Sequence, residues 1–403
     1  MQLEIIMFNM SGFSEWQKGI SNRNYQVFKK LTAHPNVKRI IAVDFLPYTL
    51  KRAARNWLEN ILYPPLSGQR GSIENVYKGA FSRMVKVNGY NSEVYVFSTI
   101  NSLISDKLTF WRLNKLLKKD IFKTSDNTKR VIWSYFPMTV DYFNNIDSDL
   151  TVFDAVDNWI YHESFGKYKE LLRDNYNTIA QKSDLIFTVS NTLVDFFKKM
   201  KRKNKVHWIS NGIETKRFKD AKPLSGDELP FNIKRPIIGY IGTIQNRFRV
   251  DLLEHLAIKN PNKSFLIVGP IWGGLKIKDV LSLRNVYTTG RVSYKDAPRY
   301  IKTFDACIIP HKVNRFVTYT NSLKVLEYLA CNKPVVSTPS SGVERFSDNI
   351  EIKKDKKEFN QALQKVLSPG YKNKLEKNKK NLSKFDWKIK VDKMVNIILQ
   401  NLK

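Results

Sequence analysis

Cysteine is scarce in this chain of 403 residues, and the two that occur, Cys307 and Cys331, lie in apolar surroundings without a metal-binding spacing. This scarcity argues against a disulfide framework or a zinc site and favours a reducing compartment. Long hydrophobic runs are also missing, because no stretch approaches the roughly 18 apolar residues of a membrane span. The first residues, MQLEIIMFNM, lack the basic start and apolar core of a signal peptide. We therefore expect a soluble intracellular protein.

Acidic residues are few: 37 Asp and Glu stand against 68 Lys and Arg, which gives a formal net charge of +31. Such an excess predicts an anionic partner, whether nucleic acid, a membrane surface or a phosphorylated substrate. Residues 51–119 carry twelve basic and four acidic residues, and residues 351–403 carry fifteen and six. Plain lysine dominates the second block, which favours solvated helix faces over a binding site.

The stretch DKLTFWRLNKLLKKDIF, residues 106–122, combines this charge with apolar side chains. Its apolar members could form one side of a helix: Leu108, Trp111, Leu113, Leu116 and Leu117. A basic amphipathic helix of this kind can lie on an anionic membrane surface. A helix that faces the core and has a solvated basic back explains the pattern equally well.

The order of apolar runs predicts an α/β protein of two domains, as the length of the chain also favours. Continuous apolar runs alternate with helical patterns, which is typical of parallel, doubly wound sheets. We expect strands at residues 3–8, 38–45, 93–99, 130–136, 150–156, 184–190 and 205–210, and then at 237–243, 264–270, 286–291, 306–312 and 334–339. The Pro- and Gly-bearing stretch 219–236 is the expected linker. Each half should be Rossmann-like, with its ligand site beyond the carboxyl ends of its strands and facing an inter-domain cleft.

Loops of the first half offer a few candidate residues. Gly12 and Arg23 follow the first expected strand, where a glycine-bearing loop before a helix can approach phosphate or sugar closely. The spacing is not that of the G-x-G-x-x-G fingerprint, so no nicotinamide or flavin cofactor is expected. Asp154 and Asp157 follow another apolar strand in DAVDNW. We interpret Asp154 as a turn or helix-capping residue and Asp157 as a candidate general base.

The second half has more candidates. In GYIGTIQNRF, small residues let backbone N–H groups meet an anion at Gly242 and Thr243, and Arg247 could add charge. The turn that contains Arg291 and Val292 could border a nucleobase.

The stretch TYTNSLKVLEYLACNKPVVST, residues 318–338, predicts a buried helix that begins after Asn321 and Ser322 and ends near Asn332. Lys324 and Glu327 share one face near its start. The pair could be a surface salt bridge, which contributes little. Alternatively, the helix N-terminus and Lys324 could bind a diphosphate while Glu327 accepts hydrogen bonds from two ribose hydroxyls.

With these motifs in their order, the chain resembles the GT-B-fold glycosyltransferases over nearly its whole length. It is most similar to the bacterial exopolysaccharide and teichuronic acid type, in which DAVDNW and TNSLKVLEYLACNKPVV are recognisable. The resemblance implies an acceptor-binding domain at 1–218, the linker 219–236, a nucleotide-sugar-binding domain at 237–385 and a terminal helix at 386–403 that returns to the first domain.

The resemblance also implies roles for the candidate residues. Glu327 would hold the donor ribose, and the phosphates would lie at Lys324 and the turn of Asn321 and Ser322. Gly242 and Thr243 would line the diphosphate, Arg291 and Val292 the base, and Gly12 and Arg23 would lie on the facing domain. Asp157 would be the base of an inverting reaction.

The sequence departs from the family's pattern at one position. Tyr319 stands where the large retaining group has the first glutamate of E-x7-E, which leaves the donor-sugar contact and the stereochemical outcome open.

The sequence thus predicts a metal-independent glycosyltransferase that uses a nucleoside diphosphate sugar, with UDP favoured. Its acceptor would be a lipid-linked or growing cell-surface glycan at the cytoplasmic membrane face, approached through the basic residues of 51–119. Two alternatives are a nucleotide-sugar 2-epimerase on the same fold and a nucleic-acid-binding protein. We disfavour the second because the charge is spread and no DNA- or RNA-binding motif occurs.

Overall fold

The computed structural model describes residues 1–44, 73–99, 107–371 and 382–403, apart from residues 18, 20, 80, 81, 203, 273 and 341, and within 45–72 it describes residues 54 and 58. Much of the basic stretch 51–119 and the lysine-rich part of the tail therefore lie outside the described residues. The chain forms two compact units: unit 1 is Met1–Ile209 with Lys388–Lys403, and unit 2 is Ser210–Trp387. Among the described residues, no helix is long and apolar enough to cross a bilayer.

Unit 1 is built on a nine-stranded sheet in the order β3-β4-β5-β2-β1-β6-β7-β8-β9. Its strands are β1 (Gln2–Phe8), β2 (Val37–Val43), β3 (Ile73–Lys78), β4 (Ser82–Val87), β5 (Glu93–Thr99), β6 (Thr128–Ser134), β7 (Leu150–Ala155), β8 (Leu185–Thr188) and β9 (Val206–Trp208). The pairs from β5 to β9 are parallel, and β3 and β4 add an antiparallel edge. The parallel sheet confirms the expectation from the continuous apolar runs.

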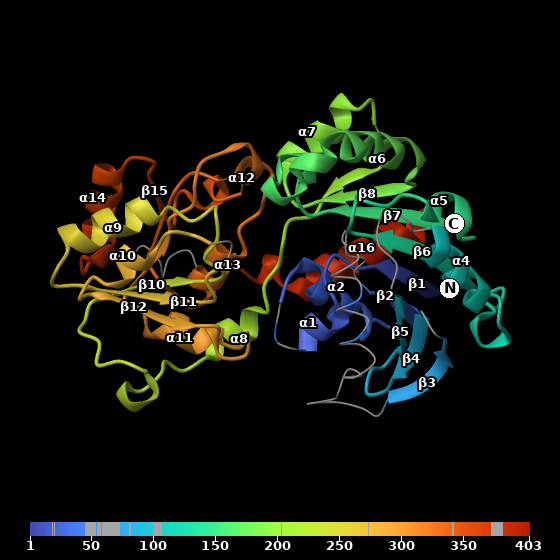
Figure 1. Ribbon diagram of the computed structural model, residues 1–403, viewed down its shortest axis with the longest axis horizontal. Coiled ribbons are helices and arrows are strands. Elements are labelled where there is room, and N and C mark those ends of the chain that lie inside the picture. Colours follow the sequence, from blue (N-terminus) through green and yellow to red (C-terminus); the bar gives the residue numbers. More distant parts are fainter. Residues whose placement is uncertain are drawn as a thin grey trace. The chain divides into compact units, whose positions relative to one another are not determined.

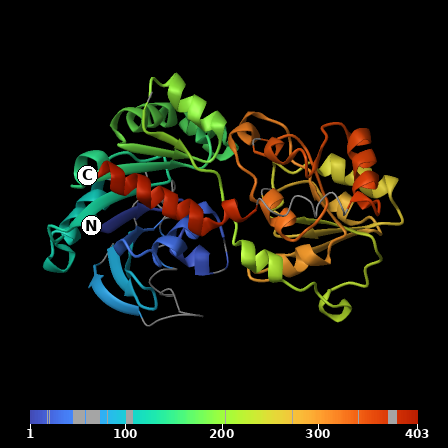
Figure 2. The ribbon, with the colours of Figure 1, turned by 180° about the vertical axis from the view of Figure 1, so that it is seen from behind.

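The helices of unit 1 are α1 (Phe13–Gln17), α2 (Arg23–Leu31), α4 (Lys107–Leu117), α5 (Tyr142–Asn145), α6 (Lys169–Lys182), α7 (Asn191–Lys199) and α16 (Trp387–Asn401). α16 runs across unit 1, and its last turns lie near the start of the chain (Figure 2). Its buried residues Val391, Met394, Val395 and Ile398 explain why it packs there.

Unit 2 has a six-stranded sheet in the order β12-β11-β10-β13-β14-β15, and every pair in it is parallel. Its strands are β10 (Ile237–Ile241), β11 (Ser264–Val268), β12 (Val286–Gly290), β13 (Ala306–Ile309), β14 (Val335–Ser337) and β15 (Glu351–Ile352). Numbered from its own first strand, this is the 3-2-1-4-5-6 order of the Rossmann fold. The order places the reversal of the chain's winding between β10 and β13.

The helices of unit 2 are α8 (Thr215–Asp220), α9 (Val250–Lys259), α10 (Lys278–Leu281), α11 (Ala297–Thr303), α12 (Arg315–Tyr319), α13 (Leu323–Ala330) and α14 (Lys356–Leu367). Helices α9, α10 and α14 cover one face of the sheet and α11 covers the other (Figure 1). One continuous apolar core fills this unit, from Ile213 to Phe385.

The structure divides the chain before the boundary expected at 218. Residues 210–218 belong to unit 2 because Ile213 donates its N–H to Phe385 O at 2.9 Å and accepts the Trp387 N–H at 3.1 Å. The stretch 219–236 also lies against unit 2, where Arg299 pairs with Glu228 at 2.7 Å.

Candidate functional site

The charged candidate site residues of unit 2 lie where the direction of winding of its sheet reverses. The loop after β10 contains Gly242 and Arg247, and His311 follows β13, the strand next to β10. In open α/β sheets, loops at the carboxyl ends of strands diverge at this point and leave room for a ligand. The candidates from these two loops and from α13 are therefore brought together.

Position 242 requires glycine because other groups lie where a Cβ would be. Its φ is +138°, and a Cβ at this position would come within 2.5 Å of Lys324 Nζ. Gly269, at the end of β11, has φ +139°, and its Cβ would meet the Gly242 carbonyl oxygen at 2.2 Å. Both conformations favour glycine. The absence of a side chain at Gly242 thus lets the Lys324 ammonium lie against the backbone at the end of β10, and the absence of one at Gly269 lets that backbone pack against the loop after β11.

Helix α13 is tied to β10 and has an open N-terminus. The Tyr328 hydroxyl accepts the Ile241 N–H at 3.0 Å, which fixes the helix beside the end of the strand. Ser322 is the N-cap, but its side chain makes no capping hydrogen bond, so the first amides remain available to an anion. At the other end, Asn332 has φ +58°, which confirms the predicted left-handed stop.

Lys324 and Glu327 do not form the salt bridge that the sequence left open. Among the described residues, neither the ammonium of Lys324 nor the carboxylate of Glu327 has an ion-pair or hydrogen-bond partner, although both are only partly exposed. Lys324 Nζ lies 5.4 Å from the centre of the Tyr240 ring. The two charges therefore remain uncompensated except through space, which costs stability and is typical of a ligand site.

The electrostatics of this cluster are cationic. Burial, followed by the nearby Arg247 guanidinium, lowers the pKa of Lys324 to about 8, while Glu327 opposes the shift. Burial raises the pKa of the Glu327 carboxyl, and Lys324 works against this. Arg247 Nε is buried and makes no hydrogen bond within the described part of the chain. An anion with two or more negative charges could compensate the positive charges of Lys324 and Arg247 together.

Two residues of this cluster were missed by the sequence analysis. His311 Nε2 and the Tyr240 hydroxyl lie 3.3 Å apart, and the backbone N–H of His311 donates to Thr338 Oγ1 at 3.1 Å. Burial, then the charges of Arg247 and Lys324, hold the pKa of His311 well below its usual value, so the imidazole is neutral at pH 7. His311 lies two residues after the end of an apolar strand, and this position was a signal that could have found it.

A third missed residue, Trp272, lies beside the predicted base-binding turn. Its ring is 45 % exposed and lies 5.9 Å from the Arg291 guanidinium. The backbone N–H of Trp272 donates to Ile244 O at 2.9 Å, so the loop after β11 borders the loop after β10. Arg291 is exposed, whereas Val292 is half-buried and packs against the core. An exposed ring next to a guanidinium is suited to stacking on a planar base.

The remaining candidates of unit 2 have structural partners. Asn321 Oδ1 accepts the Asn211 N–H at 3.2 Å, and its carbonyl oxygen accepts Asn211 Nδ2 at 2.8 Å. Its side chain thus anchors the start of unit 2, which the predicted phosphate role did not anticipate. Thr243 is half-buried, and its carbonyl oxygen accepts the Tyr240 hydroxyl at 3.3 Å. Tyr319, at the departure from E-x7-E, is the last residue of α12.

In unit 1, the interpretation of Asp154 as a turn or capping residue is wrong. Asp154 is fully buried in β7, and Arg23 Nε donates to its two carboxyl oxygens at 2.9 and 3.0 Å. Burial raises the pKa of this carboxyl, and the Arg23 charge opposes the rise. Arg23, at the start of α2, is itself 3 % exposed. The pair joins α2 to the sheet, so Arg23 is a buried ion-pair partner in this structure.

Gly12 and Asp157 lie at the same edge of the unit 1 sheet. Gly12 precedes α1, and its N–H donates to Glu15 Oε2 at 3.0 Å. Asp157 is half-buried just after β7, and its carbonyl oxygen accepts the Tyr176 hydroxyl at 3.0 Å. The next residue, Asn158, is fully buried and caps the following turn through Ile160 N–H. The backbone at Asp157 is therefore held firmly on both sides.

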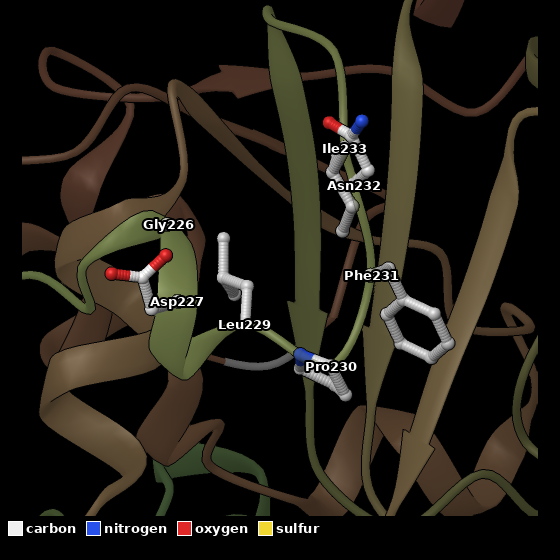
Figure 3. Close-up of a pocket in the computed structure, with 7 residues that line it drawn as sticks. All are labelled: Gly226, Asp227, Leu229, Pro230, Phe231, Asn232 and Ile233. Carbon is white, nitrogen blue, oxygen red and sulfur yellow. The ribbon is translucent and has the colours of Figure 1, made fainter.

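A surface hollow of about 510 Å³ in unit 2 does not coincide with these residues. It is lined by Gly226, Asp227, Leu229, Pro230, Phe231, Asn232 and Ile233 (Figure 3). This stretch leads into β10 and so lies at the amino ends of the strands, whereas the charged cluster follows their carboxyl ends. We assign the hollow no part in ligand binding.

Two units, each built on a mainly parallel sheet of Rossmann-like order, are the architecture of the GT-B fold. Solved structures share it: sucrose-phosphate synthase from Thermosynechococcus elongatus superimposes with a TM-score of 0.68 at 12% identity and 99% coverage of both chains. HepE from Anabaena, solved in complex with UDP-glucose, has a TM-score of 0.64 at 14% identity, over 98% of this chain and 99% of its own. At these identities the likeness concerns the fold.

Residues 235–369 match the family described as Glycosyl transferases group 1. TuaH of Bacillus subtilis (strain 168) is 26% identical over 237 residues, which are 56% of this chain. Its description provisionally names it a teichuronic acid biosynthesis glycosyltransferase. The alignment spans 60% of the length of TuaH.

Proposed function

We propose that this protein is a glycosyltransferase that takes a sugar from a nucleoside diphosphate donor. The observation that carries the proposal is a set of three charges at the reversal of the unit 2 sheet that have no ion-pair partner among the described residues: Lys324, Glu327 and Arg247. A nucleoside diphosphate complements this set, because its phosphates are anionic and its ribose has two neighbouring hydroxyl donors. The two cations and the open N-terminus of α13 would hold the phosphates.

Glu327 would bind the ribose. It lies one turn into α13 from Lys324, and a carboxylate accepts hydrogen bonds from two vicinal hydroxyls. The base would lie toward Trp272 and Arg291, whose rings and guanidinium are exposed on the adjoining loops. UDP is the proposed nucleotide, supported by the fold shared with HepE, which was solved with UDP-glucose.

The proposed reaction uses the same cations in catalysis. The acceptor hydroxyl gives its proton to the Asp157 carboxylate while its oxygen forms a bond to the anomeric carbon. The bond from that carbon to the diphosphate oxygen breaks, and the electron pair leaves with the diphosphate. Lys324, Arg247 and the amides of α13 stabilise this charge, so the chain itself supplies the electrostatic stabilisation. Direct displacement of this kind inverts the configuration of the sugar.

The proposed acceptor is a lipid-linked or growing cell-surface glycan at the cytoplasmic face of the membrane. The net charge of +31 supports this location, because anionic lipids attract basic proteins. Similarity to TuaH, whose description names teichuronic acid biosynthesis, supports a polymer of the cell envelope.

A thermal-shift panel of UDP, GDP, ADP, CMP and dTDP, each with and without magnesium, tests the donor site. A ligand that binds only the folded protein raises its melting temperature by mass action. We expect a shift with UDP that does not need magnesium and that is lost in Glu327→Ala. No shift with any nucleotide would refute the proposal. Conversion of a UDP-sugar to its epimer without an acceptor would identify an epimerase instead, and full turnover by Asp157→Asn would exclude the inverting mechanism.

A further inference from the structure

Helix α4 has apolar side chains on two sides, of which the structure buries one. Phe110, Leu113, Leu116 and Leu117 are at most 4 % exposed and pack on the core formed with β1, β2 and β5. Phe110 contacts the Phe8 ring at a centroid distance of 5.6 Å. This inner side accounts for the stability of the helix in unit 1.

The outer side contains large apolar residues that the core does not use. Trp111 is 59 % exposed, Leu108 is 50 % exposed, and Ile121 in the turn after the helix is 46 % exposed. The sequence analysis had grouped Leu108 and Trp111 with the buried leucines, which is wrong. They instead share a stripe with Lys115 and Lys118, at the spacing i, i+3, i+7 and i+10 of one helical face.

The outer side is also strongly basic. Residues 107–123 contain six Lys and Arg and a single acidic residue, Asp120. Lys115, Lys118 and Lys119 are exposed, and in the described part of the chain none of them forms an ion pair. The Lys115 ammonium lies 5.5 Å from the centre of the Trp111 ring, so cation and aromatic ring occupy the same surface.

We propose that this surface, the Trp111 patch (Leu108, Trp111, Lys115, Lys118, Lys119 and Ile121), inserts into the interface of an anionic lipid bilayer. Tryptophan favours the headgroup region, aliphatic side chains favour the acyl boundary, and lysines bind lipid phosphates. A nucleic acid would match the lysines but would leave Leu108 and Ile121 without a complementary surface. The inference rests on the proposed membrane-face function and assigns it to particular residues.

Sedimentation with vesicles tests the Trp111 patch independently of transferase activity. The full chain is mixed with vesicles of phosphatidylcholine alone or with one third phosphatidylglycerol, and we expect binding to the anionic vesicles only. Substituting Lys115, Lys118 and Lys119 by Gln should weaken binding on the order of 100-fold, since each basic residue near such a surface contributes about 1 kcal/mol. The matched control replaces Lys259, Lys276 and Lys278 of unit 2, which are also exposed, and should bind as the wild type does.

The apolar part of the patch is tested in the same assay. Leu108→Gln with Trp111→Gln should weaken binding at least tenfold, whereas Ile258→Gln, at a residue 58 % exposed in unit 2, should not. Lipids brominated near the headgroup should quench wild-type fluorescence and leave Trp111→Phe unquenched.

Four results would overturn the inference. These are no binding to anionic vesicles, equal loss of vesicle binding after either set of three lysine substitutions, fluorescence quenching by brominated lipids that persists in Trp111→Phe, or salt-sensitive binding to random DNA without vesicle binding. A UDP-induced thermal shift that survives any of these results would show that the proposed donor site stands without the Trp111 patch.

Discussion

Lys324 should make donor binding depend on pH in a defined window. Its pKa of about 8 means that the ammonium is about nine-tenths charged at pH 7 and about one-tenth charged at pH 9. UDP keeps its full charge over this range because terminal phosphates lose their second proton near pH 6. If only the charged lysine supports binding, the UDP dissociation constant should rise about tenfold from pH 7 to pH 9.

The direction of this change in UDP affinity with pH follows from proton linkage. A bound diphosphate favours the charged lysine and raises its pKa, so binding takes up a proton when the free site is partly neutral. At pH 8 about half a proton should be taken up per UDP. His311 does not interfere, since its pKa is held well below its usual value and the ring is neutral throughout.

Isothermal titration calorimetry at pH 7, 8 and 9, in two buffers of different ionisation enthalpy, measures both quantities. Lys324→Met is the matched control: it should bind UDP weakly, with no dependence on pH above 7 and no proton uptake. A wild-type affinity that stays constant from pH 7 to 9, or a slope that Lys324→Met retains, would refute the assignment of Lys324 to the diphosphate.

Three further substitutions test the close packing at Gly242, the buried ion pair of Asp154 and the stacking proposed for Trp272. Gly242→Ala places a Cβ 2.5 Å from Lys324 Nζ at φ +138°, so it should lower the free energy of unfolding in urea by more than about 1 kcal/mol and weaken UDP binding. Gly226→Ala, with open space around it, should change neither quantity. Equal effects of the two substitutions would contradict the close packing at Gly242. Asp154→Ala should destabilise unit 1 by about 3 kcal/mol because it leaves the buried Arg23 guanidinium without its acceptor oxygens. Asp120→Ala, in an exposed pair, should cost under about 1 kcal/mol. An unfolding midpoint unchanged by Asp154→Ala would show that the buried pair contributes little. Trp272→Ala should weaken UDP binding about tenfold through lost stacking and leave inorganic diphosphate binding unchanged; equal weakening of both ligands would place Trp272 away from the base.

The apolar pattern predicted the strands that form the parallel part of both sheets except β15, because strands buried on both faces must be apolar without interruption. β15 has only two residues, both half-buried, and was not predicted. The hairpin of β3 and β4 was missed. β3 is an edge strand whose residues Glu74, Asn75 and Lys78 are exposed, so it has no continuous apolar run. An apolar run in the sequence indicates a strand that is buried, and an edge strand buries too few residues to produce such a run.

Candidate site residues could be chosen from the sequence where a strand end or a helix start marked them, as at Gly242 and Lys324. The partners of the candidates Arg23 and Asn321 could not be predicted. The buried pair of Arg23 and Asp154 joins positions 131 residues apart, and the clasp of Asn321 on Asn211 joins positions 110 apart. Sequence alone does not show which carboxylate an arginine meets, and so it could not distinguish a ligand-binding arginine from a structural one.

We propose that Lys324 and Glu327 keep their charges for a donor nucleotide and not for each other. Glu327→Gln tests it when the urea midpoint and the UDP dissociation constant are measured on the same protein at pH 7.5. Burial raises the pKa of Glu327, so its ionisation opposes folding at neutral pH, and the glutamine variant should be as stable as the wild type or more stable. UDP binding should weaken about 30-fold, as expected for about 2 kcal/mol of lost charged hydrogen bonds to the ribose. A clear loss of stability with unchanged UDP affinity would show that the pair is only a salt bridge.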